Sequence, residues 1–177
     1  DSLLQNGVLV IDTSVGSNAV QPNTVSITGN ADASVDVIWR GVGSKRYAPE
    51  TIQSVRYIGN DNSDSLFVNR LFTKPVKADG FGGDDLFTVE GGNAELHGGL
   101  GNDILRGGEG VDRIWGDDGN DQIYGSGGDD FLYADDGTGR FISNDRIEGG
   151  DGNDHIYGGS GRDILIGDAG NDTIYGG

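Results

Sequence analysis

The chain has 177 residues, with 29 acidic against 12 basic ones and a formal net charge of −17 at pH 7. Glycine supplies 34 residues, cysteine none, and apolar residues only 34%. The acidic excess excludes a nucleic-acid-binding groove, because phosphate would be repelled. No stretch approaches the roughly 20 apolar residues that a membrane-spanning helix needs. A chain with no disulfide and few apolar residues needs another source of stability, and a bound metal is the usual one.

Residues 1–79 contain short segments in which apolar and polar residues alternate between Gly, Asn, Asp and Pro turns. This alternation predicts half-buried β-strands. The segments are 8–11, 24–28, 34–39, 51–58 and 65–68. We therefore expect an irregular all-β N-terminal region over 1–79, either irregular β rungs of a solenoid or a small β-sandwich. We favour rungs, because Gly59–Leu66 looks like a decayed copy of the repeat that follows.

A nine-residue unit recurs over 80–177 with the consensus Gly-Gly-x-Gly-x-Asp-x-U-x, where U is a large aliphatic residue. The unit at 89–97 has Ala94 in place of the aspartate, and 134–148 hold one unit with a six-residue insertion around Gly137–Phe141. A strict nine-residue period predicts a solenoid in which each rung is one glycine-rich turn and one short strand. Two rungs then make a coil of 18 residues, with two parallel sheets.

The eighth position of each unit is predicted to point into the core, because side chains alternate along a strand. These residues are Leu105, Ile114, Ile123, Leu132, Ile147, Ile156, Leu165 and Ile174. The sixth-position aspartates of alternate units are predicted to stack at about 4.8 Å, where bare carboxylates would repel each other. One stack is Asp84 or Asp85, Asp103, Asp121, Asp145 and Asp163, and the other is Asp112, Asp130, Asp154 and Asp172. Carboxylate and carbonyl oxygens together favour Ca²⁺ over Mg²⁺.

Units such as Gly149–Tyr157 resemble the RTX, or haemolysin-type, calcium-binding repeat. The resemblance covers 80–177 and implies a right-handed parallel β-roll with Ca²⁺ between adjacent turns, in a secreted bacterial protein. The implied ligands are the stacked aspartates with turn glycines, namely Gly99, Gly101, Gly108, Gly110, Gly119, Gly128, Gly150, Gly152, Gly159, Gly161 and Gly170. One ion at each step between stacked aspartates gives roughly seven Ca²⁺. We expect Ala94 to weaken a site, and the insertion to distort the step from Asp121 to Asp145.

We expect no enzymatic activity, since the chain has no cysteine nucleophile and no histidine pair at metal-binding spacing. A glycosidase acid pair among the carboxylates is the weaker alternative, because the repeat already accounts for most of them. Ninth positions on one sheet form an outward aromatic row. Its members are Trp115, Tyr133, Tyr157 and Tyr175. The row either binds a carbohydrate or a partner protein, or stabilises the sheet by stacking.

The chain stops within a unit, at Gly176-Gly177. We expect from this either head-to-tail assembly of copies or continuation into a longer secreted chain. The favoured interpretation is an extracellular or cell-surface bacterial protein that is folded by Ca²⁺ and has a structural or adhesive role, as in a surface layer, adhesin or filament. The alternative is a calcium-dependent folding and secretion module of a larger enzyme or toxin.

Overall fold

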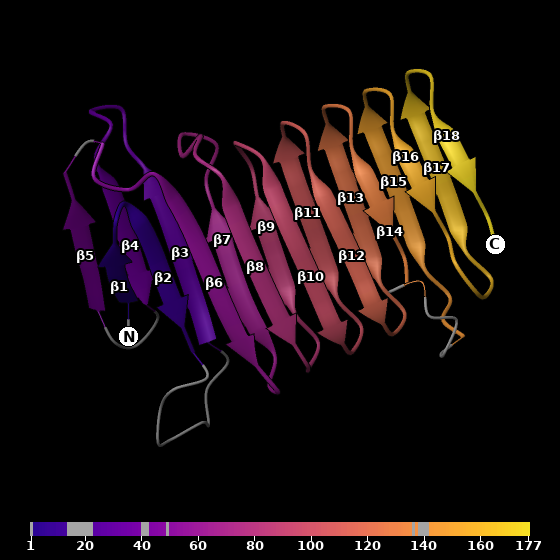
Figure 1. The fold of residues 1–177 in the computed structure, drawn as a ribbon, viewed down its shortest axis with the longest axis horizontal. Helices are drawn as coiled ribbons and strands as arrows, with labels where there is room; N and C mark the ends of the chain where they lie inside the picture. Colours follow the sequence, from indigo (N-terminus) through magenta and orange to yellow (C-terminus); the bar gives the residue numbers. More distant parts are fainter. Residues whose placement is uncertain (1, 14–22, 40–42, 49, 136, 138–141) are drawn as a thin grey trace.

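The computed structural model describes residues 2–13, 23–39, 43–48, 50–135, 137 and 142–177. Within these ranges the chain forms 18 β-strands and no α-helix. The strands build two nine-stranded sheets, sheet A and sheet B, as the chain winds from one to the other and back. The coil advances in one direction from its indigo N-terminal end to its yellow C-terminal end (Figure 1). The expected all-β roll is therefore confirmed.

The two sheets take alternate strands of the chain over most of its length. Sheet A contains, in spatial order, β1 (Ser2–Gln5), β2 (Val8–Asp12), β6 (Ser54–Asn60), β8 (Val76–Phe81), β10 (Ala94–Leu100), β12 (Arg113–Asp118), β14 (Phe131–Tyr133), β16 (His155–Tyr157) and β18 (Thr173–Tyr175). Sheet B contains β5 (Gly43–Tyr47), β4 (Val35–Trp39), β3 (Asn23–Gly29), β7 (Asp64–Val68), β9 (Leu86–Val89), β11 (Ile104–Glu109), β13 (Gln122–Gly127), β15 (Arg146–Asp151) and β17 (Ile164–Ala169).

Parallel pairing with an 18-residue step sets the register of the regular part. Glu95 of β10 pairs with Arg113 of β12, and Ile104 of β11 pairs with Gln122 of β13. The insertion lengthens one step to 24 residues, so that Gln122 pairs with Arg146, without moving the strands out of register. The insertion itself, around Gly137–Phe141, lies almost entirely outside the described residues.

The N-terminal strands join the same two sheets. β2 pairs in parallel with β6, and β3 pairs in parallel with β7, as the irregular-rung interpretation expected. Beyond them both sheets change to antiparallel pairing, between β1 and β2 in sheet A and among β3, β4 and β5 in sheet B. β8 runs across residues 79 and 80, so both regions share sheet A, and the division into two domains stays a prediction.

A narrow apolar core runs the length of the roll between the sheets. Six of the eight predicted inward residues have no exposed surface: Leu105, Ile114, Ile123, Leu132, Ile147 and Ile156. The other two differ, because they lie in the outermost strands β17 and β18, which have a neighbour on one side only. Leu165 is partly buried, and Ile174 is 45% exposed.

Candidate metal-binding site

Aspartates line the two sides of the roll where the chain passes between the sheets. The first carboxylate column lies in the turns from sheet A to sheet B and comprises Asp64, Asp85, Asp103, Asp121, Asp145 and Asp163. The second carboxylate column lies in the turns from sheet B to sheet A and comprises Asp112, Asp130, Asp154 and Asp172. The 18-residue coil forms both, because it returns every second unit to the same side.

Each aspartate except Asp64 uses one carboxylate oxygen to accept a backbone N–H from the preceding coil of its column. The Asp85 N–H donates to Asp103 Oδ1 at 2.7 Å, and the Asp103 N–H donates to Asp121 Oδ1 at 2.8 Å. The other oxygen, Oδ2, has no hydrogen-bond partner among the described residues in seven of these side chains. They are Asp85, Asp103, Asp112, Asp121, Asp130, Asp154 and Asp163. Buried acceptors without a donor are costly, so the columns are incomplete without another group.

First-position glycines make room for these oxygens. A Cβ atom on Gly98 would lie 2.2 Å from Asp103 Oδ2 and 2.7 Å from the carbonyl oxygen of Gly116 on the next coil. In the second column a Cβ on Gly125 would lie 2.4 Å from Asp130 Oδ2 and 2.5 Å from the next coil's Gly149 carbonyl. A carboxylate oxygen and a carbonyl oxygen thus converge beside both of these glycines, which suits a hard cation.

The turn glycines expected as ligands share a backbone conformation that favours glycine. Second-position glycines such as Gly99 (φ 107°) and fourth-position glycines such as Gly119 (φ 146°) have the positive φ that other residues avoid. The remaining members share it: Gly101, Gly108, Gly110, Gly128, Gly150, Gly152, Gly159, Gly161 and Gly170. A Cβ on Gly119 would lie only 1.5 Å from the Gly101 carbonyl oxygen, so backbone carbonyls stack closely along each column.

Burial makes these carboxyl groups hard to ionise on their own. Loss of hydration, with repulsion from neighbouring aspartates adding to it, raises the pKa of Asp85, Asp121 and Asp130 to about 8. Burial likewise raises the pKa of Asp103 and Asp112 to about 6. Hydrogen bonds from the preceding backbone amide act in the opposite direction. A cation beside Oδ2 would remove this penalty, because it compensates the buried negative charge.

At the N-terminal end of each column the residue contacts differ from those of the regular units. The first column extends to Asp64, whose carboxylate accepts a hydrogen bond from the Asn60 N–H at 2.9 Å and contacts the buried Tyr57 hydroxyl. In the second column Ala94 takes the aspartate's place and donates its N–H to Asp112 Oδ1 at 2.6 Å. The step between Ala94 and Asp112 therefore has one carboxylate instead of two.

The insertion leaves the first column intact, contrary to expectation. The Asp121 N–H donates to Asp145 Oδ1 at 2.7 Å, as at the regular steps, because Asp135 and Ser143 on either side of the insertion still contact the turn of the next coil. Ser143 stands at the fourth position, and its hydroxyl lies 2.7 Å from Asp135 Oδ1 and 2.6 Å from Asp145 Oδ2. Ser143 thus supplies a protein hydroxyl to Asp145 Oδ2, as Tyr57 supplies one to the Asp64 carboxylate.

The structure also chooses between the two adjacent acids of the first regular unit. Asp85 belongs to the first carboxylate column and is 2% exposed. Asp84 lies instead in an exposed row of fifth-position side chains, where Asp84 Oδ1 accepts the Asn102 N–H at 2.8 Å. Asn102, Asn120 and Asn144 continue that row, each accepting the next backbone N–H.

Comparison with known proteins agrees with this geometry. A family model described as the RTX calcium-binding nonapeptide repeat, four copies, matches residues 79–114, 106–140 and 142–174. The chain belongs to the RTX calcium-binding repeat family. RTX repeats bind Ca²⁺ and characterise secreted bacterial proteins. A search of curated proteins and a search of solved structures each found no significant match.

The donor set of the RTX repeats fits Ca²⁺ in particular. Each step between two aspartates offers carboxylate oxygens and several turn carbonyls, all of them oxygen atoms, and the turns are adaptable. Within the described ranges no three His, Cys, Asp or Glu side chains come together as a metal cluster. Backbone carbonyls would therefore have to supply most of the ligands. Nor do the described residues include a helix long and apolar enough to cross a membrane.

The predicted aromatic row of the RTX roll is a continuous stack on the outer face of sheet A. Trp115 and Tyr133 lie 5.3 Å apart between ring centroids, Tyr133 and Tyr157 4.8 Å, and Tyr157 and Tyr175 4.9 Å, all nearly parallel. His97 extends the stack, 4.4 Å from Trp115. Because each ring covers its neighbour's face, the row presents mainly ring edges outward.

Sequence reasoning missed three parts of the site. It did not include Asp64, although Gly59, Asp64 and Leu66 keep the first, sixth and eighth positions of the unit. It named second- and fourth-position glycines but not the first-position glycines that face the unpartnered oxygens. It also left His97 out of the aromatic row, although His97 occupies the ninth position of the degenerate unit.

Proposed function

We propose that the chain is a secreted, extracellular calcium-binding repeat protein whose roll is folded by Ca²⁺ held in the two carboxylate columns. The observation that carries this proposal is the set of buried Oδ2 atoms that have no hydrogen-bond partner and lie beside glycines and carbonyl oxygens. Cation binding would supply the missing partner at each step. Binding free energy would then be folding free energy for these rungs.

Steps with two aspartates set the number of ions in this proposal. The first column has four such steps from Asp85 to Asp163, and the second has three from Asp112 to Asp172. One ion at each step gives roughly seven Ca²⁺. Their charge of about +14 would offset most of the formal −17. We expect affinities of roughly 0.1–1 mM, as in extracellular calcium modules.

A calcium titration tests the proposal directly. Far-UV circular dichroism should show β structure rising as Ca²⁺ is added to the chelated protein, and calorimetry should count roughly seven ions. Asp121→Asn should lower the count, because it removes a carboxylate shared by two steps. Asp151→Asn is the matched control, with the same charge change on an exposed side chain. Equal β content with chelator and with millimolar Ca²⁺, or equal effects of the two variants, would contradict the proposal.

For the biological role we propose structural or adhesive assembly, as in a surface layer, adhesin or extracellular filament, with no catalytic activity. Supporting it, the buried carboxylates of the regular units belong to the columns, and both histidines lie in outward ring stacks. The outermost strands expose Ile164, Ile174 and Tyr175, an apolar surface for another copy in head-to-tail contact. The same surface equally suits the remainder of a larger secreted enzyme or toxin, which is the second candidate.

Two measurements separate these roles. Light scattering in millimolar Ca²⁺ should show association that Ile164→Asp weakens, and a monomer at all concentrations would remove the assembly role. Carbohydrate is a second proposed partner of the aromatic row, through ring edges and hydroxyl groups. Glycan-array binding that Tyr157→Ala abolishes would support it, and absence of binding in Ca²⁺ would exclude it.

A further inference from the structure

We propose that the rungs before Gly98 fold without Ca²⁺ and form a template on which Ca²⁺ winds the later rungs in the N-to-C direction. The inference rests on the proposed calcium-dependent folding and adds where folding starts and which way it runs. It divides the roll into a part held by apolar packing and a part held by ions, although both share the same two sheets.

The apolar core is concentrated in the early rungs. Nineteen of the 26 buried apolar side chains in the described residues precede Gly98, so most of the hydrophobic stabilisation lies there. Eight of the ten strands of this part bury two apolar side chains each, as Leu66 and Val68 do in β7. A regular strand such as β11 buries only Leu105, and its next inward position is Gly107.

Apolar pairs fill the places in the second carboxylate column where the early rungs would otherwise need ions. In a regular turn the column pairs a first-position glycine with a sixth-position aspartate, as in Gly107 and Asp112. One coil earlier the same two places hold Val89 and Ala94. The coil before that has Val68 and Val76, which pair with Val89 and Ala94 in the sheets. These four side chains are 0–4% exposed, so packing replaces the cation.

The first carboxylate column needs no ion at its N-terminal member either. The Asp64 carboxylate is held by the Asn60 N–H and the Tyr57 hydroxyl, both from the same rung. Tyr57 reaches it from an inward position of β6 and is fully buried. The Tyr57 hydroxyl is hydrogen-bonded to Asp64, whereas Asp85 Oδ2 lies beside the Gly98 carbonyl oxygen of the next coil. The change from protein contacts to ions therefore lies at the step from Asp85 to Asp103.

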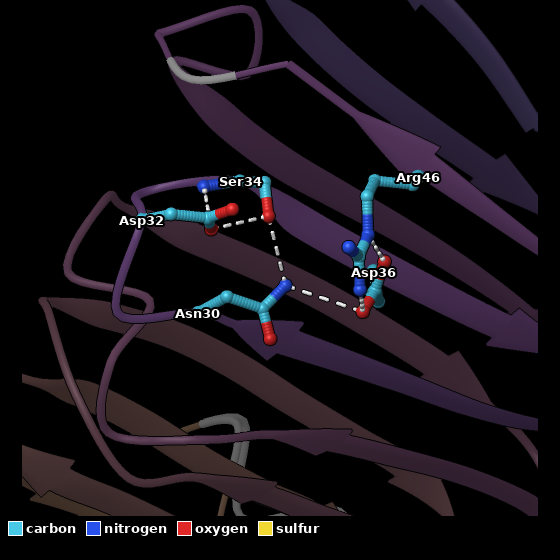
Figure 2. A network of polar contacts seen from close by, with 5 residues as sticks. All are labelled: Asn30, Asp32, Ser34, Asp36 and Arg46. Carbon is cyan, nitrogen blue, oxygen red and sulfur yellow. Dashed lines mark hydrogen bonds and ion pairs between the residues drawn. The ribbon is translucent and has the colours of Figure 1, made fainter.

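Local hairpins close the N-terminal end of the early rungs. β3, β4 and β5 pair with their sequence neighbours, so their contacts form over short loops. Hydrogen bonds and an ion pair between side chains hold these hairpins together (Figure 2). Asn30 Nδ2 donates to Ser34 Oγ at 3.1 Å and to Asp36 Oδ2 at 3.2 Å, and Arg46 forms a two-point contact with Asp36 at 2.6 and 2.7 Å.

The place of the apolar template at the N-terminal end sets the direction of winding, and the hydrogen bonds between coils provide the docking points. Each new aspartate accepts an N–H from the rung before it, so a folded rung presents a fixed donor to the next one. At the edge of the template these donors are the Asp85 N–H, 2.7 Å from Asp103 Oδ1, and the Ala94 N–H, 2.6 Å from Asp112 Oδ1. These two donors therefore bind the first calcium-dependent aspartate of each column, Asp103 and Asp112, and a cation completes the rung that docks there.

Hydrogen exchange read by mass spectrometry tests the template on the full chain. In chelator, amides of β3, β6, β7 and β8 should exchange at least about 100-fold more slowly than an unfolded chain, while those of β11 to β18 should not. Added Ca²⁺ should then protect the later strands. Equal exchange in both parts in chelator would overturn the proposal. Failure of Ca²⁺ to bind at all would instead refute the proposed function, and calorimetry on the same sample distinguishes the two results.

Two matched variants test the direction. Asp103→Asn should abolish calcium-induced protection from β11 onwards, whereas Asp163→Asn should leave β11 to β14 protected. Equal loss of protection in both variants, or greater loss of protection upstream in Asp163→Asn, would overturn the N-to-C order.

A gain-of-site variant, Val89→Gly with Ala94→Asp, rebuilds the pair found at Gly107 and Asp112. This double variant should bind one more Ca²⁺, and β9 and β10 should lose their protection from hydrogen exchange in chelator. If both the number of bound ions and the protection stay unchanged, apolar packing does not replace an ion at this step.

Discussion

Gly119→Ala offers a sharp test of how closely the turns are stacked. The added Cβ would lie 1.5 Å from the Gly101 carbonyl oxygen, and real contacts of this kind are essentially never shorter than 3.0 Å. Adjacent coils would therefore have to separate locally by at least about 1.5 Å. That movement would break the bond from the Gly101 N–H to the Asp118 carbonyl, at 2.9 Å, and the bond from the Asp103 N–H to Asp121 Oδ1, at 2.8 Å.

The cost of Gly119→Ala follows from these contacts. A lost neutral hydrogen bond costs about 1 kcal/mol and one to a carboxylate about 1.5–3 kcal/mol. Holding alanine at the φ of 146° observed for Gly119 adds roughly 1–3 kcal/mol. The sum, about 3.5–7 kcal/mol, is comparable to the total stability of a small domain. We therefore expect the first column to be interrupted at this step.

The assay is a calcium titration of Gly119→Ala beside Gly176→Ala. Gly176 has no other atom within 4 Å of its ideal Cβ position and no positive φ, so its alanine variant should bind Ca²⁺ like the parent chain. Gly119→Ala should bind at least one ion fewer and gain less β structure in circular dichroism. If Gly119→Ala matches Gly176→Ala in both ion count and midpoint, the close stacking of turns is wrong.

Three further predictions concern the pH dependence of the metal-free fold, the apolar core and the aromatic row. In the folded chain the pKa is about 6 for Asp103 and Asp112 and about 8 for Asp121 and Asp130, above the usual value for aspartate. Folding without Ca²⁺ therefore favours the protonated carboxyl groups. The metal-free fold should be most stable below about pH 4 and should lose that stability as pH rises through 6 and 8. Far-UV circular dichroism in chelator at pH 4, 6 and 8 checks the sign, because β structure of the metal-free chain should fall as pH rises, and β content that increases with pH would contradict it. Ca²⁺ binding at pH 7 should also release protons. Ile123→Ala should lower the free energy of unfolding in Ca²⁺ by about 2–5 kcal/mol, while Ile174→Ala, at a side chain 45% exposed, should cost less than about 1 kcal/mol in the same urea titration. Trp115→Ala should cost about 1–3 kcal/mol through two lost ring stacks, with Thr173→Ala as an outward control on the same sheet, and equal midpoints would show that the stack adds no stability.

Spacing alone was enough to predict the repetitive half of the molecule. The nine-residue period fixes which side chains alternate inward, so Leu105, Ile114 and Ile123 are buried as predicted. The sixth-position aspartates are likewise brought to one side of the roll every second unit, because two units close one coil. These features are local and repeat identically, so each unit predicts the next one.

The pairing of strands far apart in the sequence decided which irregular residues join the columns. Asp64 joins the first column across a 21-residue step and Asp145 across a 24-residue step, and neither spacing follows from the repeat. The exchange of a glycine and an aspartate for Val89 and Ala94 looks like decay in the sequence. Only the stacking of the coils shows that Val89 and Ala94 occupy the places where later coils have a glycine and an aspartate, so that apolar packing stands where an ion would bind.

The sequence by itself thus determined the fold class, the inward residues and the two rows of aspartates, because these depend on alternation within nine residues. Only the tertiary structure decided that Asp85 and not Asp84 stands in the column, that ring faces in the aromatic row are covered, and that the early rungs are held by packing. Each of those outcomes depends on which rung lies against which, and parallel pairing over 18 to 24 residues sets that contact.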